Sequence, residues 1–429
     1  MRPRGNIVPR RRGHPPAAAA PSFICSTCRF AAAATVSRPR RARPFSSTSP
    51  VHSYSLPPPP SPSGLVALSS RRLISVSGPD SPKFLQGVIT QNILPPSASN
   101  GNSSSSHPAG AGSYAAFLNA TGRVLHDVFV YPDARGSPGE SFLIEVDAAE
   151  APRLERHIKR YKLRAKFAVR LLDPGEVTVW HGWDDSGSNS TALDAGTGLD
   201  APHGLVHLKD PRAPGLGYRM LTEAGREPAV GLERAADEDV YRVRRYLMGV
   251  PEGQLELLRE GALPLEGNLD VMGGIDFRKG CYVGQELTIR TKHRGVVRKR
   301  ILPAMIYGAD GAEQPRQLEY LPGGSHPGGA VQSAASIPAD TSIGRFEKRG
   351  RSAGKWLRGV GNVGLALCRL EIMTDVVLPG ETAASSYTPA DEFIMEREAG
   401  ENGEEPFKVK IKAFVPDWLR QGLNEQQKH

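Results

Sequence analysis

The chain has 429 residues, enough for two or three domains, and 39% of them are hydrophobic and 23% charged. Its formal charge of +9 comes from 54 basic and 45 acidic residues, but ten of the basic residues are arginines within the first 50 positions, and without them 44 basic residues face 45 acidic ones. This near-neutral balance argues against a nucleic-acid-binding class, and no apolar run is long enough to span a bilayer, so we expect neither nucleic acid nor a membrane as a partner.

Residues 1–55 have the composition of a mitochondrial transit peptide followed by a linker. The first 50 positions contain no Asp, Glu or Lys and are rich in Ala, Ser and Pro. Arg-rich, Ser-containing and acid-poor leaders direct import into mitochondria, although a disordered basic arm that binds nucleic acid is the alternative. Cys25 and Cys28 lie inside this segment and lack a second cysteine pair, so we expect no redox or metal site there.

Between residues 65 and 300, strands and helices mix without a strict strand–helix–strand order, which favours an α+β fold. Helices are expected to begin at Asp80 or Ser81, at Asp147 and at Asp237, because these side chains can cap a first helical turn. Gly249 is expected to end the last of the three. The expected strands cover residues 73–77, 114–119, 124–131, 167–172 and 177–180.

After Val296 the pattern changes to short strands, expected over residues 297–306, 360–371 and 408–414. They indicate a small C-terminal β-barrel over residues 301–420. Cys368 lies in an apolar, strand-like run and is expected in its core.

Three polar or Gly/Pro-rich stretches have no means of building a core of their own, so we expect them to be exposed insertions. They are residues 97–113, 184–200 and 308–337.

The most informative segment runs from Arg278 to Glu286 and contains a single thiol, Cys281. Gly280 and Gly284 flank it, and glycine permits a tight turn or a close backbone approach. Cations immediately before the thiol, and a helix expected to begin just after it, both favour the reactive thiolate form. These features indicate a presented thiol; a buried cysteine in a Gly-rich turn is the alternative.

The stretch from Gly274 to Glu286, followed by Arg290 and by Gly295–Arg300, resembles the motif of the YgfZ family. That family consists of folate-binding proteins built like the T-protein (aminomethyltransferase) of the glycine cleavage system, and its mitochondrial branch comprises iron–sulfur cluster assembly factors. The resemblance implies two intertwined α+β domains around a central cavity, which we place at residues 65–300, followed by the β-barrel. Further matching stretches are Leu73–Asp80, Phe84–Gly87, Phe117–Arg123 and Leu263–Asp270.

The resemblance gives Cys281 the central role, as a transient cluster ligand or a redox-active thiol. Iron–sulfur clusters are usually held by about four protein ligands, so a single cysteine would have to share the cluster with a partner. Arg278 and Lys279 would keep the thiol ionised, and Gly280 and Gly284 would shape the turn. Tyr282, Gln285 and Glu286 complete the motif, and the last two are expected to hold the loop by hydrogen bonds.

A basic run from Arg290 to Arg300 follows the motif. It has no interleaved aromatic residues, so base stacking is not indicated. A solvated strand edge and a site for an anion or an acidic partner both remain open.

Asp127 matches the second acidic position of the Gly-Gly-x-x-Asp-Asp segment of T-proteins, so it is the candidate catalytic and folate-binding residue. From the pattern alone, a polar residue on the solvent face of a strand is equally consistent. His126 is expected to be structural. T-proteins bind the pterin with the glutamate of a Gly-Tyr-Thr-Gly-Glu segment, whereas the matching stretch here, Leu216–Leu221, has no carboxylate.

Our first hypothesis is a protein of the mitochondrial matrix that assists assembly or insertion of [4Fe–4S] clusters into aconitase-type and radical-SAM enzymes, with A-type scaffold proteins as partners. This role does not require catalysis. The alternative is an enzyme, a tetrahydrofolate-dependent aminomethyl transferase in which Asp127 acts and Cys281 is structural. A passive interaction module is the third possibility.

Overall fold

The computed structural model describes nine stretches of the chain, all within one compact unit, Ser55–His429. The predicted leader with Cys25 and Cys28 and most of residues 97–113 and 184–200 lie outside them. More than half of residues 308–337 is described, and its Tyr320, Ala334 and Ile337 are buried, so this stretch is not the exposed insertion that was expected. The described residues are 56–94, 112–187, 205–235, 237–309, 312–322, 333–347, 350–378, 387–398 and 406–427.

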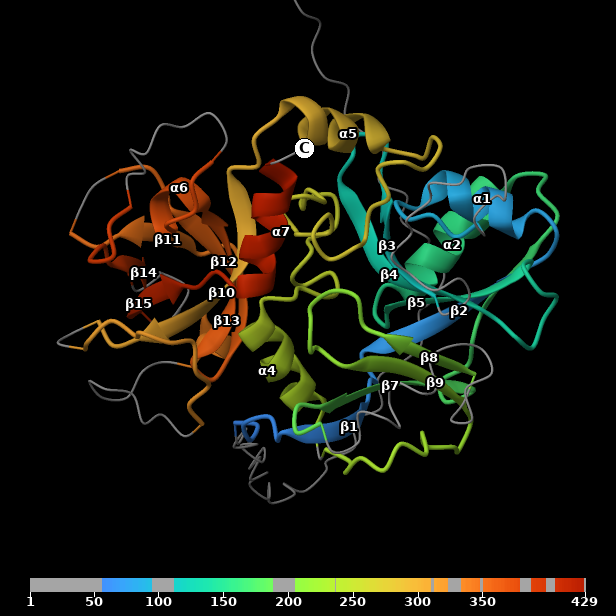
Figure 1. Ribbon diagram of the computed structural model, residues 1–429, viewed down its shortest axis with the longest axis horizontal. Helices are drawn as coiled ribbons and strands as arrows, with labels where there is room; N and C mark the ends of the chain where they lie inside the picture. Colours follow the sequence, from blue (N-terminus) through green and yellow to red (C-terminus); the bar gives the residue numbers. More distant parts are fainter. Residues whose placement is uncertain are drawn as a thin grey trace, which may run out of the picture. The chain divides into compact units, whose positions relative to one another are not determined.

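A five-stranded antiparallel sheet with the order β3-β4-β5-β2-β6 carries helices α1 (Ser81–Val88) and α2 (Ala151–Lys162) on one face (Figure 1). Leu85 of α1 and Leu154 and Ile158 of α2 are fully buried in the core against this face. The strands are β2 (Arg71–Ser77), β3 (Ser113–Leu118), β4 (Val124–Pro132), β5 (Ser141–Asp147) and β6 (Ala168–Leu171).

A second sheet has the order β1-β7-β9-β8, and its strands are β1 (Ser63–Ala67), β7 (Val177–Asp184), β8 (Val206–Lys209) and β9 (Tyr218–Glu223). The chain passes from β1 into the five-stranded sheet and returns at β7, so the two sheets are intertwined, as the family resemblance implied. One hydrophobic core joins them: Phe129 of β4 and Trp183 of β7 both belong to it.

Six strands close into a C-terminal barrel with the order β10-β13-β12-β11-β14-β15, which confirms the predicted barrel. Closure leaves no free sheet edge. Trp356 and Cys368 lie in its core, and a Cβ at Gly364 would overlap the Trp356 ring. The strands are β10 (Lys299–Tyr307), β11 (Ser342–Arg345), β12 (Gly354–Val360), β13 (Val363–Arg369), β14 (Phe393–Arg397) and β15 (Phe407–Ala413).

Helix α4 (Glu238–Met248) connects the barrel to the rest of the unit by packing on β10, β13 and β1. It begins and ends where the sequence predicts. The Asp237 carboxylate accepts a hydrogen bond from the Asp239 amide, and Gly249 ends the helix at φ 73°. The C-terminal helix α7 (Asp417–Gln427) also reaches α4, since the Trp418 indole donates to the Met248 carbonyl at 3.0 Å.

Two predicted boundaries are wrong. The strand expected over residues 360–371 is shorter in the structure, where β13 covers Val363–Arg369, because Gly361, at φ 58°, reverses the chain before it and the short helix α6 (Leu370–Met373) follows it. The helix expected at Asp147 begins at Ala151, since Asp147 ends β5 and its carboxylate accepts a hydrogen bond from the Ala149 amide. Strands β1, β5, β8, β9, β11, β12 and β14 and helices α6 and α7 were not predicted. Within the described ranges, no helix combines the length and the apolar character needed to cross a bilayer.

A buried ion pair fixes the start of the barrel. The Arg300 guanidinium of β10 donates two hydrogen bonds to the Asp270 carboxylate, at 2.6 and 3.0 Å, and both side chains are almost completely buried. We expect Asp270→Asn to lower the free energy of unfolding by about 3 kcal/mol, because it leaves a buried guanidinium without its counter-charge. Urea denaturation measures this change.

The matched control is Asp340→Asn, which removes the carboxylate from the exposed Lys355–Asp340 pair and should cost less than about 1 kcal/mol. Equal losses in the two variants would show that the Arg300–Asp270 pair does not stabilise the barrel junction.

Candidate functional site

Cys281 lies in a loop that ends at helix α5 (Gln285–Arg294), which begins where the sequence predicts, and its side chain is exposed. Two backbone hydrogen bonds hold this loop against the segment at the end of α1: Asp276 N donates to Thr90 O and Val283 N donates to Gly87 O, both at 3.0 Å. The sulfur therefore projects from an anchored loop. Cys368, the second free cysteine among the described residues, is fully buried, and burial raises the pKa of its thiol.

Lys279 anchors the loop. Its ammonium group donates to the carbonyls of Ile89 and Gln91, at 2.7 and 2.9 Å, and lies 5.1 Å from the centre of the Tyr282 ring. Burial lowers the pKa of Lys279 to about 8. We expected this cation to keep the thiol ionised, but its hydrogen bonds go to backbone carbonyls. A sequence pattern does not reveal these contacts, because the carbonyls belong to the distant end of α1.

Gly284 is required by its surroundings, whereas Gly280 is not. Gly284 caps α5 at φ 81°, and a Cβ there would overlap the Asn119 carbonyl in the turn between β3 and β4. A Cβ on Gly122, in the same turn, would likewise overlap the Gly284 carbonyl and the Leu287 side chain. No atom lies within 4 Å of the position that a Cβ would occupy on Gly280.

Of the remaining motif residues, two contribute to the structure of the loop and two are exposed to solvent. The Gln285 side-chain oxygen accepts a hydrogen bond from Tyr282 N at 3.2 Å, which agrees with its predicted role in holding the loop. The Tyr282 side chain is buried. Arg278 and Glu286 are exposed, and the role of Glu286 in holding the loop stays a prediction.

Asp127 is far from solvent. Asp127 is two residues before Phe129 on β4, so both side chains lie on the face of the strand that is turned to the core shared with the second sheet. The exposed fraction of Asp127 is 0%. Both carboxylate oxygens accept a hydrogen bond from Gly253 N, at 3.1 and 3.2 Å, and one lies 3.9 Å from the Arg71 guanidinium. Burial raises the pKa of Asp127. The alternative of a solvent-facing strand position is therefore wrong.

Asp127 belongs to a larger set of buried charges, which we call the buried ion-pair network. Its centre is Glu252, which accepts hydrogen bonds from Arg212 at 2.7 Å, from the Tyr241 hydroxyl at 2.8 Å and from Arg219. Burial opposes ionisation of Glu252, but Arg219 and Arg212 hold its pKa well below the usual range. The members are Arg71, Asp127, Glu145, Asp210, Arg212, Arg219, Arg245, Glu252 and Glu256.

This network occupies the place where the resemblance implied a folate site. Arg219 lies within Leu216–Leu221, the stretch that matches the pterin-binding segment of T-proteins. Its guanidinium binds Glu252 and Glu145. The cavity beside it, lined by residues such as Arg71 and Gly253, holds about 70 Å³. Pockets for drug-sized ligands span roughly 300–1,000 Å³. This cavity is therefore too small to hold tetrahydrofolate.

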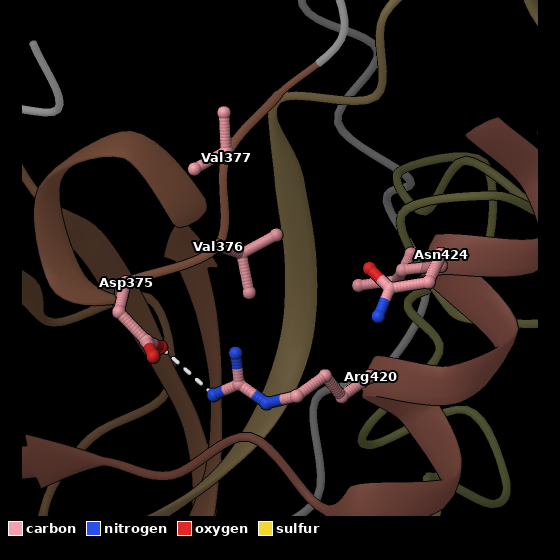
Figure 2. A pocket seen from close by; sticks show the side chains of 6 residues that line it. Asp375, Val376, Val377, Arg420 and Asn424 are labelled. Carbon is pink, nitrogen blue, oxygen red and sulfur yellow. Dashed lines mark hydrogen bonds and ion pairs between the residues drawn. The ribbon is translucent and has the colours of Figure 1, made fainter. Parts of the chain in front are cut away.

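A larger pocket, of about 220 Å³, lies on the barrel side between the segment after α6 and helix α7. Figure 2 shows Asp375 and Arg420 facing each other across it, and they form an ion pair at 2.8 Å. Neither Cys281 nor Asp127 lines this pocket.

Among the residues that the structure describes, no three His, Cys, Asp or Glu side chains gather as a metal site. Cys281 and Asp127 are not in one site: the first lies on an exposed loop and the second in the buried ion-pair network. The network was not predicted from the sequence. The available signal was the spacing of Tyr241 and Arg245, which lie one helical turn apart on α4.

His126 is buried and structural, as predicted, and provides a pH test. Its Nε2 lies 2.8 Å from the Arg259 guanidinium, and burial together with that charge lowers its pKa to about 3. The unfolded chain takes up a proton near the ordinary histidine pKa of about 6.5, so it binds more protons than the folded chain between that pH and about 3. Stability from the neutral imidazole is therefore lost as the pH falls through this window.

We expect His126→Gln to flatten the pH dependence of the free energy of unfolding by up to about 1.4 kcal/mol per pH unit below pH 6.5. Urea denaturation of both proteins over this range measures it. Parallel curves for the two proteins would contradict the buried, neutral assignment.

Comparison with known proteins agrees with this architecture. Residues 298–421 match the family described as CAF17, C-terminal beta-barrel domain. The glycine cleavage system aminomethyltransferase T from Bartonella henselae shares the fold, with a TM-score of 0.50 over 84% of this chain and 87% of its own. The sequence identity is 13%, so this likeness concerns the fold alone.

Two proteins named iron-sulfur cluster assembly factor IBA57 homolog, mitochondrial, are much closer in sequence. The one from Pyricularia oryzae is 58% identical over 366 residues, covering 85% of this chain and 86% of its own length. The one from Chaetomium globosum is 51% identical over 418 residues, covering 95% of each. Together with the aminomethyltransferase-like fold and the C-terminal barrel, these identities show that the chain belongs to the family of mitochondrial iron–sulfur cluster assembly factors.

Proposed function

We propose that this protein assists assembly or insertion of [4Fe–4S] clusters into aconitase-type and radical-SAM enzymes of the mitochondrial matrix, and that Cys281 supplies one ligand to a cluster shared with an A-type scaffold protein. The observation that carries the proposal is the exposed thiol of Cys281 on an anchored loop. A cluster ligand must reach a second protein, which an exposed sulfur can do and the buried Cys368 cannot.

The chemistry is a ligand exchange at iron. The Cys281 thiol gives its proton to solvent, its sulfur binds iron, and a ligand from the scaffold leaves. Cys281 alone cannot replace the roughly four ligands of a cluster. Since the described residues offer no group of further donors, the partner supplies the remaining thiolates.

The folate-dependent transferase is the less supported alternative. Its candidate residue, Asp127, is fully buried and hydrogen-bonded to the Gly253 amide, so a substrate amine has no access to it. The cavity beside Gly253, of about 70 Å³, is smaller than a folate would need.

Cys281→Ser tests the proposal directly. Because the side chain is exposed, we expect the free energy of unfolding to change by no more than about 0.5 kcal/mol. Aconitase activity in mitochondria that contain only this variant should fall to the level of mitochondria without the protein. Undiminished aconitase activity would sink the proposal.

The matched control is Cys368→Ala, which removes the other thiol of the described part of the chain and should support aconitase activity wherever the variant folds. Loss of activity in a stably folded Cys368→Ala protein would show that the effect is not specific to Cys281.

A titration with tetrahydrofolate separates the two functions. Calorimetry should detect no saturable binding to the wild-type protein, because the cavity beside Gly253 is too small. Saturable binding that Asp127→Asn abolishes would instead support the transferase.

A further inference from the structure

The structure divides the basic run of residues 290–300 into two halves with different environments. The second half is internally paired: Arg298 lies 3.1 Å from Glu371, Lys299 lies 3.7 Å from Glu266, and Arg300 binds Asp270. These cations stabilise the junction between the Cys281 region and the barrel, so they are not available to a ligand.

The first half is exposed on α5. Glu286, Arg290, His293 and Arg294 are all solvent-exposed, and their spacing places them on one face of the helix. Within the part of the chain that the structure describes, the side chains of Arg290, His293 and Arg294 have no hydrogen-bonding or ion-pair partner. Figure 1 shows α5 lying outside the two sheets and the barrel.

Two exposed arginines on other elements of the described chain are each paired with a carboxylate. Arg153 pairs with Glu150 at 3.0 Å and Arg170 with Glu176 at 2.7 Å. By contrast, residues 278–300 contain eight Lys or Arg residues and one acid, Glu286. The exposed face of α5 thus has a surplus of positive charge that its own chain does not neutralise.

Two exposed apolar side chains flank this charged face. Val283, at the end of the Cys281 loop, is 44% exposed, and Val296, just past the end of α5, is 37% exposed. Arginine combined with exposed apolar groups is typical of protein–protein interfaces.

Ten helical residues span about 15 Å, so the cations of α5 lie within one or two Debye lengths of the Cys281 loop at physiological salt.

We propose that the exposed face of α5, together with Arg278, is the docking surface for an acidic protein that carries the cluster to Cys281. This inference rests on the proposed function and adds the chemistry of the partner. Thiolate ligands outweigh the positive charge of an iron–sulfur core, so the cargo itself is anionic, and complementary charge accelerates encounter. The Cys281 loop and the start of α5 are held together by Gly284, which fixes the docking face relative to the thiol.

The first test uses Cys281 as a probe of the local field. The full chain with Cys25→Ser and Cys28→Ser reacts with a dianionic disulfide (dithiobis-nitrobenzoate) and with a neutral one (dithiodipyridine). In each case the thiolate attacks a disulfide sulfur, a mixed disulfide forms, and the aromatic thiolate leaves. We expect Arg290→Glu with Arg294→Glu to lower the ratio of anionic to neutral rates by at least about fivefold at low salt.

The matched control reverses the charge of two exposed arginines on another helix, Arg156→Glu with Arg160→Glu on α2, and should leave the ratio unchanged. High salt should reduce the ratio in the wild type and have little effect in the α5 variant. An α5 variant with an unchanged ratio, or a control variant with the same decrease, would overturn the inference.

The second test uses a purified, cluster-loaded A-type scaffold protein and stopped-flow measurement of the association rate. The α5 charge reversal should slow association by at least about tenfold at low salt, while the α2 control matches the wild type. Equal association rates in the α5 variant and the wild type would refute the docking surface. Failure of the proposed function would appear differently, as the lack of a Cys281-dependent thiolate-to-iron absorption band in the wild-type complex.

Discussion

The buried ion-pair network is the constraint on which the interior of this protein depends. A guanidinium or carboxylate without a partner at full burial would cost several kcal/mol, so Arg212, Arg219 and Glu252 must be positioned together. Arg219 lies in β9, Arg212 in the loop between β8 and β9, and Glu252 in the segment after α4, and Glu252 binds both arginines. The interior between the two sheets is occupied by these paired side chains.

The two candidate residues therefore lie in different environments, Asp127 in the interior and Cys281 at the surface. Asp127 is a member of the network and accepts its hydrogen bonds from Gly253, whereas the Cys281 loop is anchored on the outside, at the end of α1. An assembly factor must transfer its cargo between proteins and needs an accessible ligand more than an enclosed pocket. A shared fold can therefore belong to families with different functions.

Local signals predicted much of the fold. Helix α4 was found because its start and end are encoded by adjacent residues, Asp237 and Gly249. The hairpin of β12 and β13 was missed because its two apolar strands are separated only by Gly361 and Asn362, so the periodicity runs through the turn. Strands β11 and β14 were missed because each is short and paired only through the closed barrel.

The sequence by itself determined that Cys281 lies in a loop, since it stands between two glycines and just ahead of a helix, and the structure then showed that its thiol is exposed. Only the tertiary structure decided the roles of the neighbouring charges. Lys279 binds carbonyls at the end of α1, Arg300 pairs with Asp270, and Arg290 remains exposed, although all three look alike in a basic sequence. The reason is physical: the role of a charge is set by its counter-charge and its burial, and both depend on residues that are distant along the chain.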